Sequence, residues 1–363
     1  MIVVAKIGTS SITDDQGDIS RPAVDKLCSE VAGLRSQGHQ VVVVTSGAIS
    51  AGLPALGLSG TRPADIATLQ AISAVGQSRL MGVYDAALVA YGLVAGQVLL
   101  APHDFVHRSQ YLHARQTLSR LLELGVVPVV NENDAVADDE IRFGDNDRLA
   151  ALVANLVSAE LLVLLTDAPG LLSADPRLHS DGSLIEEIVE VDHELERIAG
   201  GRGTDRGSGG MASKLAAAKM ASWSGVRTVI AAADRPAVLQ GALAGGAGVG
   251  TVVRPHERRL GARKLWIAFA VGASGTVVVD DGARRALTER ARSLLAAGVV
   301  AVQGKFEPDD AVEIADPSGR VFAKGLVRLS ASDLASVAGR RTGDLPDGVP
   351  HEVVHRDDLV TLP

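Results

Sequence analysis

Short apolar runs alternate with amphipathic stretches over the first two thirds of the chain. Several runs contain almost only Val, Leu and Ile, which is typical of strands buried on both faces of a parallel sheet. The pattern predicts an α/β domain in which helices sandwich a mainly parallel sheet. We expect strands at residues 2–7, 40–45, 93–100, 126–130, 161–166 and 227–231, and helices at residues 21–37, 66–91, 109–123, 147–158, 211–224 and 237–244.

The pattern changes after this alternating region. A glycine-rich stretch at 245–250 ends the alternation, and a basic, polar connector follows at 254–263. Beyond it, short apolar runs separated by turn signals surround one helical stretch at 282–297, which predicts a small, mostly-β second domain. Its expected strands are residues 276–279, 299–302, 311–314, 321–325 and 353–355. We therefore divide the chain into a first domain at 1–255, a linker at 256–271 and a second domain at 272–363.

Composition narrows the classes of protein. The chain has 363 residues, of which 47% are hydrophobic and only 3% aromatic, so aliphatic side chains must build the core. The net charge of −8 argues against a globally basic nucleic-acid binder. Cys28 is the single cysteine, which we interpret as a core residue in a reducing compartment. The first residues lack a basic leader, and no apolar run reaches the ~20 residues of a spanning helix, so we expect a cytoplasmic protein with no membrane partner.

The most polar strand end lies at residues 131–134, with the sequence Asn-Glu-Asn-Asp, directly after the apolar run 126–130. A second cluster at 144–147, Gly-Asp-Asn-Asp, opens the next helical stretch. Ligands of open α/β sheets bind outside the carboxyl ends of the strands, so these clusters favour a polar ligand there. A solvated loop with an aspartate as helix N-cap is the alternative.

Two other strand ends carry small and polar residues. Lys6 and the Gly-Thr-Ser that follows Ile7 can form a concave anion site, although a strand-end lysine can also simply face water. Ser46 and Gly47 offer a hydroxyl and an unobstructed backbone at the end of the second strand. The nucleophile motif Gly-x-Ser-x-Gly is missing there, so we favour ligand hydrogen bonding, with an ordinary tight turn as the alternative.

Two further segments suit a nucleotide. Thr166 and Asp167 close the fifth strand and can hold a polar edge, although the Pro-Gly after them also fits a plain turn. A glycine-rich loop at 203–211 leads into the helix that carries Lys214, which suits phosphate oxygens. It is not a P-loop. Residues 207–212 match a relaxed dinucleotide fingerprint, but they follow a polar loop instead of a strand, and a flexible loop remains the alternative.

The histidines do not share metal-binding spacings, so no protein-only metal site is evident. Carboxylates at strand ends suit a Mg²⁺ ion that arrives with phosphates.

Taken together and in this order, these segments resemble the amino-acid kinase family over about residues 1–253. The lysine and glycine loops are shared across that family. The specific part is the pair of segments 131–136 and 143–147, which resembles the branch that phosphorylates glutamate. The second domain resembles a PUA domain, with Gly304-Lys-Phe306 and Gly325-Leu-Val327 where its glycine-marked strands would stand.

The resemblance implies an amino-acid kinase fold and ATP-dependent phosphorylation of the γ-carboxylate of L-glutamate, the first step towards proline. The residues that it assigns to glutamate are Ser46, Asp134 and Asn146. The residues that it assigns to ATP are Lys6, Thr166, Asp167, Ser208, Gly209, Gly210, Met211, Ala212, Ser213 and Lys214. The chemistry agrees with this division, because an ammonium group pairs with a carboxylate such as that of Asp134, and phosphates pair with basic residues.

A carboxylate acceptor is already ionised at neutral pH, so direct in-line transfer needs no general base, only positioning and charge neutralisation. We assign Lys6 and Lys214 to the transferring phosphoryl group, Asp147 to orienting both lysines, and Mg²⁺ to bridging the phosphates. The resemblance also implies feedback inhibition by proline in the glutamate pocket and a homo-oligomer.

Three alternatives stay open. Aspartate, acetylglutamate or uridylate kinases are the neighbours within the family. RNA binding by the second domain rests on arginines 284, 285, 290 and 292 of one expected helix, whereas the net charge favours a solvated helix face. A dinucleotide-dependent oxidoreductase rests only on the misplaced glycine fingerprint.

Overall fold

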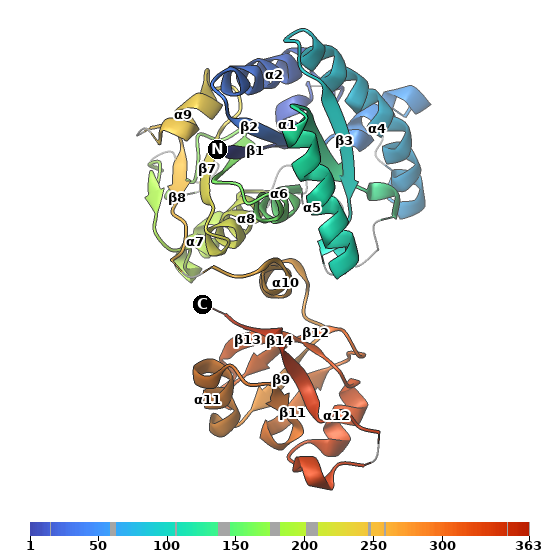
Figure 1. Ribbon diagram of the computed structural model, residues 1–363, viewed down its shortest axis with the longest axis vertical. Helices are drawn as coiled ribbons and strands as arrows, with labels where there is room; N and C mark the ends of the chain where they lie inside the picture. Colours follow the sequence, from blue (N-terminus) through green and yellow to red (C-terminus); the bar gives the residue numbers. More distant parts are fainter. Residues whose placement is uncertain are drawn as a thin grey trace. The chain divides into compact units, whose positions relative to one another are not determined.

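The structure is a computed structural model of the chain. It describes residues 1–363 except 15, 59–62, 106, 137–145, 175–181, 201–209, 246–247, 258, 347 and 363. The chain forms two compact units, Met1–Arg259 and Leu260–Pro363 (Figure 1). The helix α10 (Ala262–Leu265) and a π-helical turn (Trp266–Ala270) belong to the second unit, although they fall within the segment that we expected to be a linker.

The first unit is built on a mainly parallel sheet. In the described part of the chain, eight strands have the order β3-β4-β2-β1-β5-β7-β8-β6, and β7 with β8 is the antiparallel pair among them. The expected α/β class is therefore confirmed. The strands are β1 (Ile2–Ile7), β2 (Gln40–Val44), β3 (Ala95–Leu100), β4 (Val127–Glu132), β5 (Leu161–Thr166), β6 (Glu187–Ile188), β7 (Arg227–Ala232) and β8 (Thr251–Val253).

Strand β1 lies in the middle of this sheet, between β2 and β5, and its Val3, Val4 and Ala5 are fully inaccessible to solvent. All six residues of β5 are buried as well. An apolar strand with neighbours on both edges and helices on both faces explains the continuous aliphatic runs in the sequence. The edge strand β6 and its neighbour β8 have only two and three residues, too short to show a periodic pattern, and the sequence did not predict them.

Helices cover both faces of the sheet (Figure 1). Helices α2 and α9 pack against each other on one face, and α6 and α8 pack together on the other. Two of the long helices have a side-chain cap at their N-terminus. Ser20 caps α2 and Asp65 caps α4, and each side chain accepts a hydrogen bond from a backbone N–H group of the first turn. The helices are α1 (Thr9–Ile12), α2 (Arg21–Ser36), α3 (Ala48–Gly52), α4 (Ile66–Val89), α5 (Arg108–Glu123), α6 (Asn146–Leu156), α7 (His193–Ala199), α8 (Met211–Trp223) and α9 (Val238–Ala244).

Helices α3 and α4 touch backbone to backbone at two glycines. A Cβ atom on Gly76 would overlap the carbonyl oxygen of Ala48, and one on Gly52 would overlap the carbonyl oxygen of Ile72. Only glycine fits at both places. Since α3 begins directly after Ser46 and Gly47, this contact holds the end of β2 against α4. Gly47 itself has a φ of 97°, a left-handed conformation that favours glycine.

The second unit is rich in β-structure, as expected. Its six described strands have the order β10-β14-β13-β12-β9-β11 and enclose their own aliphatic core. The strands are β9 (Gly275–Val279), β10 (Leu294–Leu295), β11 (Val299–Gly304), β12 (Ala311–Ala315), β13 (Val321–Val327) and β14 (Glu352–Thr361), and two longer helices are α11 (Asp281–Arg290) and α12 (Ala331–Val337).

Two expectations for the second unit are wrong. The expected helix at 282–297 stops at Arg290, because Ala291 turns into the left-handed region with a φ of 46° and residues 294–295 pair with β14. The helix α12 was not predicted. It begins where Ser330 accepts a hydrogen bond from the backbone N–H of Asp333, and it buries Leu334 and Val337.

The interpretation of Cys28 as a core residue agrees with the structure. Its side chain is inaccessible to solvent, and burial, followed by the charge of Asp25, raises the pKa of the thiol to about 12. Across the described helices, none combines the length and apolar character that a membrane crossing requires.

Candidate active site

Three of the predicted catalytic side chains meet at the carboxyl end of β1. The Nζ atom of Lys6 lies 2.5 Å from Oδ1 of Asp147, and Nζ of Lys214 lies 3.3 Å from Oδ2 of the same carboxylate. Lys6 comes from β1, Asp147 from the first turn of α6 and Lys214 from the first turn of α8. The hydroxyl of Ser213 donates to Oδ2 of Asp147 over 2.6 Å. One carboxylate therefore holds two lysines from distant parts of the sequence.

This cluster is buried. Lys6, Asp147 and Lys214 expose 3%, 1% and 5% of their surfaces. Burial raises the pKa of Asp147, but the charges of Lys6 and Lys214 outweigh burial, and the pKa falls to about 2. Asp147 is therefore ionised at neutral pH. The lowered pKa favours the folded state above the ordinary aspartate pKa of about 3.9, and this contribution is lost as the pH falls towards 2.

A second polar group lies beside the cluster. Asn146, next to Asp147 in the first turn of α6, donates from Nδ2 to the hydroxyl of Ser46 over 3.1 Å. Its Oδ1 accepts from the backbone N–H of Glu132 over 3.2 Å. The structure thus brings two of the three predicted glutamate residues into contact, across the ends of β2 and β4.

Asp134, the third residue that we assigned to glutamate, lies two residues beyond the end of β4, at the start of a 3-10 turn, and is buried. Its Oδ2 accepts a hydrogen bond from the hydroxyl of Ser73 over 2.7 Å. Ser73 belongs to α4, so this helix supports the amino-acid side of the site.

Helix α4 supplies further buried polar residues that the sequence reasoning missed. Gln77 accepts a hydrogen bond from Asn131 over 2.8 Å, and the hydroxyl of Tyr84 lies 2.8 Å from that of Thr45. Ser73, Gln77 and Tyr84 follow one another at spacings of four and seven residues, which places them on one helix face. The signal in the sequence that could have identified them is the presence of polar residues on one face of an otherwise apolar helix.

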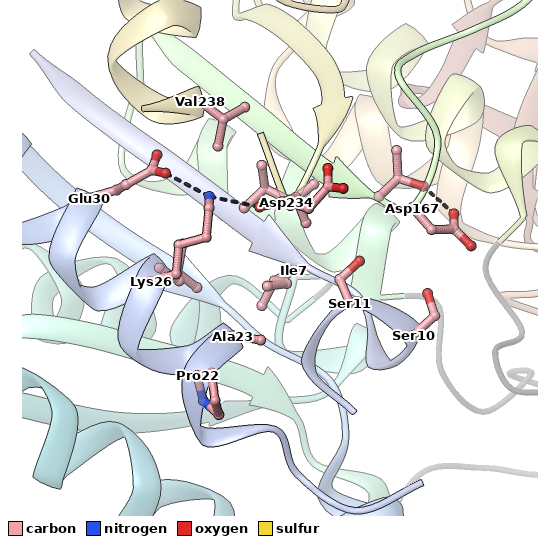
Figure 2. A pocket seen from close by; sticks show the side chains of 14 residues that line it. Ile7, Ser10, Ser11, Pro22, Ala23, Lys26, Glu30, Asp167, Asp234 and Val238 are labelled. Atoms are coloured by element: carbon pink, nitrogen blue, oxygen red, sulfur yellow. Dashed lines mark hydrogen bonds and ion pairs between the residues drawn. The ribbon is translucent and has the colours of Figure 1, made fainter. Parts of the chain in front are cut away.

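Thr166 and Asp167 lie at the end of β5, where the Thr166 hydroxyl donates to Oδ1 of Asp167 over 3.0 Å. Both line a cavity of about 440 Å³ (Figure 2). Its apolar lining includes Ile7 and Val238, and its polar lining includes Lys26, which donates to Glu30 and to the carbonyl of Ala233.

This cavity and the lysine cluster are on opposite faces of the sheet. Ile7 lines the cavity and Lys6 joins the cluster, and adjacent residues of a strand point to opposite faces. The two regions share the strand ends: Ser10 and Ser11 border the cavity just after the turn that follows Lys6. The sequence did not predict this cavity.

The predicted glycine-rich loop is described only from Gly210 onward. Gly210 caps α8, and its carbonyl accepts the Ser213 hydroxyl over 2.9 Å, so Gly210, Met211, Ala212 and Ser213 form the start of the helix that carries Lys214. Ser208 and Gly209 lie outside the described residues, as do Phe143, Gly144 and Asp145 of the second polar cluster.

Comparisons with known proteins agree with this arrangement. The model of the amino acid kinase family matches residues 1–232, and that of the PUA domain matches residues 275–348. The chain therefore belongs to the amino acid kinase family.

Its relatives narrow the group further. A glutamate 5-kinase of Caldanaerobacter subterraneus is 42% identical, over 100% of this chain and 98% of that protein. A glutamate 5-kinase of Herpetosiphon aurantiacus is 45% identical over 100% and 98%, and one of Nocardia farcinica is 46% identical over 99% and 96%. These full-length matches place the chain among the glutamate 5-kinases.

Proposed function

We propose that this chain transfers the terminal phosphoryl group of ATP to the γ-carboxylate of L-glutamate, the first step of proline biosynthesis. The full-length relatives carry the name of this activity. The observation that carries the proposal is the position of the buried pair Lys6–Lys214, held by Asp147, beside the Ser46–Asn146 pair. Anionic phosphates and a polar amino acid are the ligands that these neighbouring groups suit.

The two ends of the site have different tasks. Asp134 holds the α-ammonium of glutamate, and Ser46 and Asn146 hydrogen-bond its body. Lys6 and Lys214 stabilise the charge on the transferring phosphoryl group, and Asp147 keeps both lysines in place. Thr166, Asp167 and the residues from Ser208 to Lys214 bind the nucleotide. The transfer is in-line, from the γ-phosphorus to a γ-carboxylate oxygen, with ADP leaving, and no general base takes part.

Magnesium belongs to this proposal as an ion that the nucleotide brings. Both oxygens of Asp147 are engaged by lysines or Ser213, so this carboxylate does not fit a metal-ligand role. Within the described ranges, no three His, Cys, Asp or Glu side chains are grouped as metal ligands. A Mg²⁺ ion prefers oxygen ligands such as those of the phosphates, and on binding them it would neutralise part of their charge.

The test is ATP turnover with Mg²⁺ and L-glutamate in the presence of hydroxylamine, which traps an acyl phosphate as a hydroxamate. We expect glutamate-dependent hydroxamate. Aspartate, acetylglutamate and UMP serve as matched acceptors, and turnover with one of them alone would move the specificity elsewhere in the family. A folded chain that turns over none of the four would contradict the proposal.

Proline inhibition is a further part of the proposal. Proline has the same α-ammonium and α-carboxylate as glutamate, so Asp134 can bind it in the amino-acid pocket. We expect proline to raise the KM for glutamate and to leave the kcat unchanged. Rates measured at subsaturating glutamate with millimolar proline check this, and an unchanged rate would show that proline does not bind there.

We also place the protein in the cytoplasm, as a homo-oligomer. The buried thiol of Cys28 fits a reducing compartment. Light scattering that returned the mass of a single 37.5 kDa chain would contradict the oligomer. Of the four arginines considered for RNA binding, Arg284 is engaged by Asp316 at 3.4 Å and by the ring of Phe322.

A further inference from the structure

We infer that Gln77 of α4 binds the α-carboxylate of the amino-acid substrate and thereby selects α-amino acids. The inference rests on the proposed function and extends it to a residue that neither the sequence motifs nor the relatives' names assign. It depends on a buried side-chain amide whose orientation is fixed by its neighbours and whose N–H groups find no acceptor among the residues that the structure describes.

The orientation of Gln77 follows from a chain of hydrogen bonds. The backbone N–H of Glu132 donates to Oδ1 of Asn131 over 2.9 Å, which leaves Nδ2 of Asn131 as the end that faces Gln77. Because Nδ2 is a donor, its partner 2.8 Å away must be the oxygen of Gln77. The Gln77 amide nitrogen is therefore the end that remains.

That nitrogen is a buried donor for which the described part of the chain offers no acceptor. Gln77 is 8% exposed, and among the described residues its Nε2 atom has no hydrogen-bond partner. Leaving a buried donor unsatisfied is costly, so such groups are rare and call for an explanation. A substrate carboxylate, which only accepts hydrogen bonds, would satisfy this donor.

The position of Gln77 selects the α-carboxylate over the γ-carboxylate. Ser73 and Gln77 are one helical turn apart on α4, and they contact Asp134 and Asn131 respectively. Asp134 is the proposed partner of the α-ammonium. The α-carboxylate is attached to the same carbon atom as that ammonium, so its donor must come from the neighbourhood of Asp134. The γ-carboxylate must instead reach the phosphoryl group at Lys6 and Lys214.

Two substitutions distinguish binding of the substrate by Gln77 from a role in which Gln77 only holds Asn131 in place. Gln77→Glu keeps an oxygen to accept from Asn131, but it replaces the donor with a negative charge at pH 8. Gln77→Met removes both functions at similar length. If Gln77 binds the substrate, we expect both variants to raise the KM for glutamate by roughly 10- to 100-fold, with Gln77→Glu the more severe. The KM for ATP should stay within about twofold, which a general loss of structure would not allow.

Substrate analogues identify the carboxylate that is bound. Glutarate lacks the ammonium, and 4-aminobutyrate lacks the α-carboxylate. Both analogues are tested as competitors of glutamate in the hydroxamate assay. In Gln77→Met, the inhibition constant of glutarate should rise in parallel with the KM for glutamate, whereas that of 4-aminobutyrate should stay at its wild-type value. Asp134→Asn is the matched control with the opposite pattern: it should weaken 4-aminobutyrate and leave glutarate nearly unchanged.

The outcomes are separable. A Gln77→Glu variant with the wild-type KM for glutamate would mean that Gln77 only supports Asn131, and the inference would be overturned. Equal weakening of glutarate and 4-aminobutyrate in Gln77→Met would overturn it as well. If Gln77→Met does not fold, Gln77→Glu carries the test, because it preserves the contact with Asn131. A wild-type chain that forms no hydroxamate would remove the proposed function and this inference together.

Discussion

Lys214→Ala should lower the kcat on the order of 10²–10³-fold, by analogy with the loss of one donor to a transition state. Lys214 lies 3.3 Å from Asp147 at the start of α8, where we place the transferring phosphoryl group. Its ammonium neutralises charge that develops only during transfer, so the KM for glutamate should change far less than the kcat. Steady-state rates in the hydroxamate assay measure both.

The same helix offers a matched control for that substitution. Lys219 lies five residues further along α8 and pairs with Glu196 at 2.8 Å, away from the cluster. Lys219→Ala removes an equal charge and side chain, and we expect turnover within about twofold of the wild type, since pairs of this kind contribute little. A folded Lys214→Ala protein with near-normal turnover would remove Lys214 from the mechanism. The kcat of Lys6→Ala should fall as far as that of Lys214→Ala, because Asp147 holds both lysines.

Gly76→Ala should destabilise the first unit by about 3 kcal/mol or more, at or beyond the upper end of typical overpacking costs. The added methyl group would overlap the carbonyl oxygen of Ala48, a backbone atom that cannot turn aside as a side chain could. Helices α3 and α4 would have to separate, and Ser46 would move with α3. The midpoint of thermal unfolding and the kcat should therefore fall together.

Gly82→Ala, in the same helix, is the control for Gly76→Ala. Gly82 has open space around its Cβ position, so alanine should be neutral or should stabilise the helix by up to about 1 kcal/mol. This pair of variants separates the steric effect from helix propensity. If Gly76→Ala unfolded at the same midpoint temperature as the wild type, α3 would be able to shift at little cost in folding free energy.

Much of the first unit could be predicted from the sequence because its strands are long and buried on both faces. The runs that became β1 and β5 are almost purely aliphatic, so each can be predicted as a strand without knowledge of its neighbours. The short strands β6 and β8 depend on pairing with β7 and with each other. Such pairing is tertiary information that no local pattern contains.

The second unit shows a different kind of error. The stretch 282–297 has helix-forming residues to its end, and the sequence alone could not reveal that Ala291 ends the helix by adopting a left-handed conformation. Pairing of Leu294 and Leu295 with β14 decides the outcome, since it gives the following residues a sheet to join. Tertiary contacts therefore override a local preference here.

In the candidate site, charged residues at a strand end or a helix start could be found from the sequence, and the residues that support them could not. Lys6 lies at the end of an apolar strand, and Asp147 and Lys214 lie in the first turns of helices that follow polar or glycine-rich segments. Gln77 and Ser73 lie inside a helix whose residues are mostly apolar, and only the fold shows that they face Asn131 and Asp134. Such supporting residues are harder to predict from the sequence, because the residues that they contact are distant in the sequence.

The central position of β1 has a consequence for the synthesis of the chain. Among the strands of this sheet, residues 2–7 are synthesised first, yet one of their two neighbours, β5, begins only at Leu161. Until then the edge of β1 that pairs with β5 has no native partner, and an apolar strand with an unpaired edge is prone to associate with other chains. Lys214 arrives later still. A nascent chain that ends before Leu161 therefore contains Lys6 but cannot yet bury the strand that carries it.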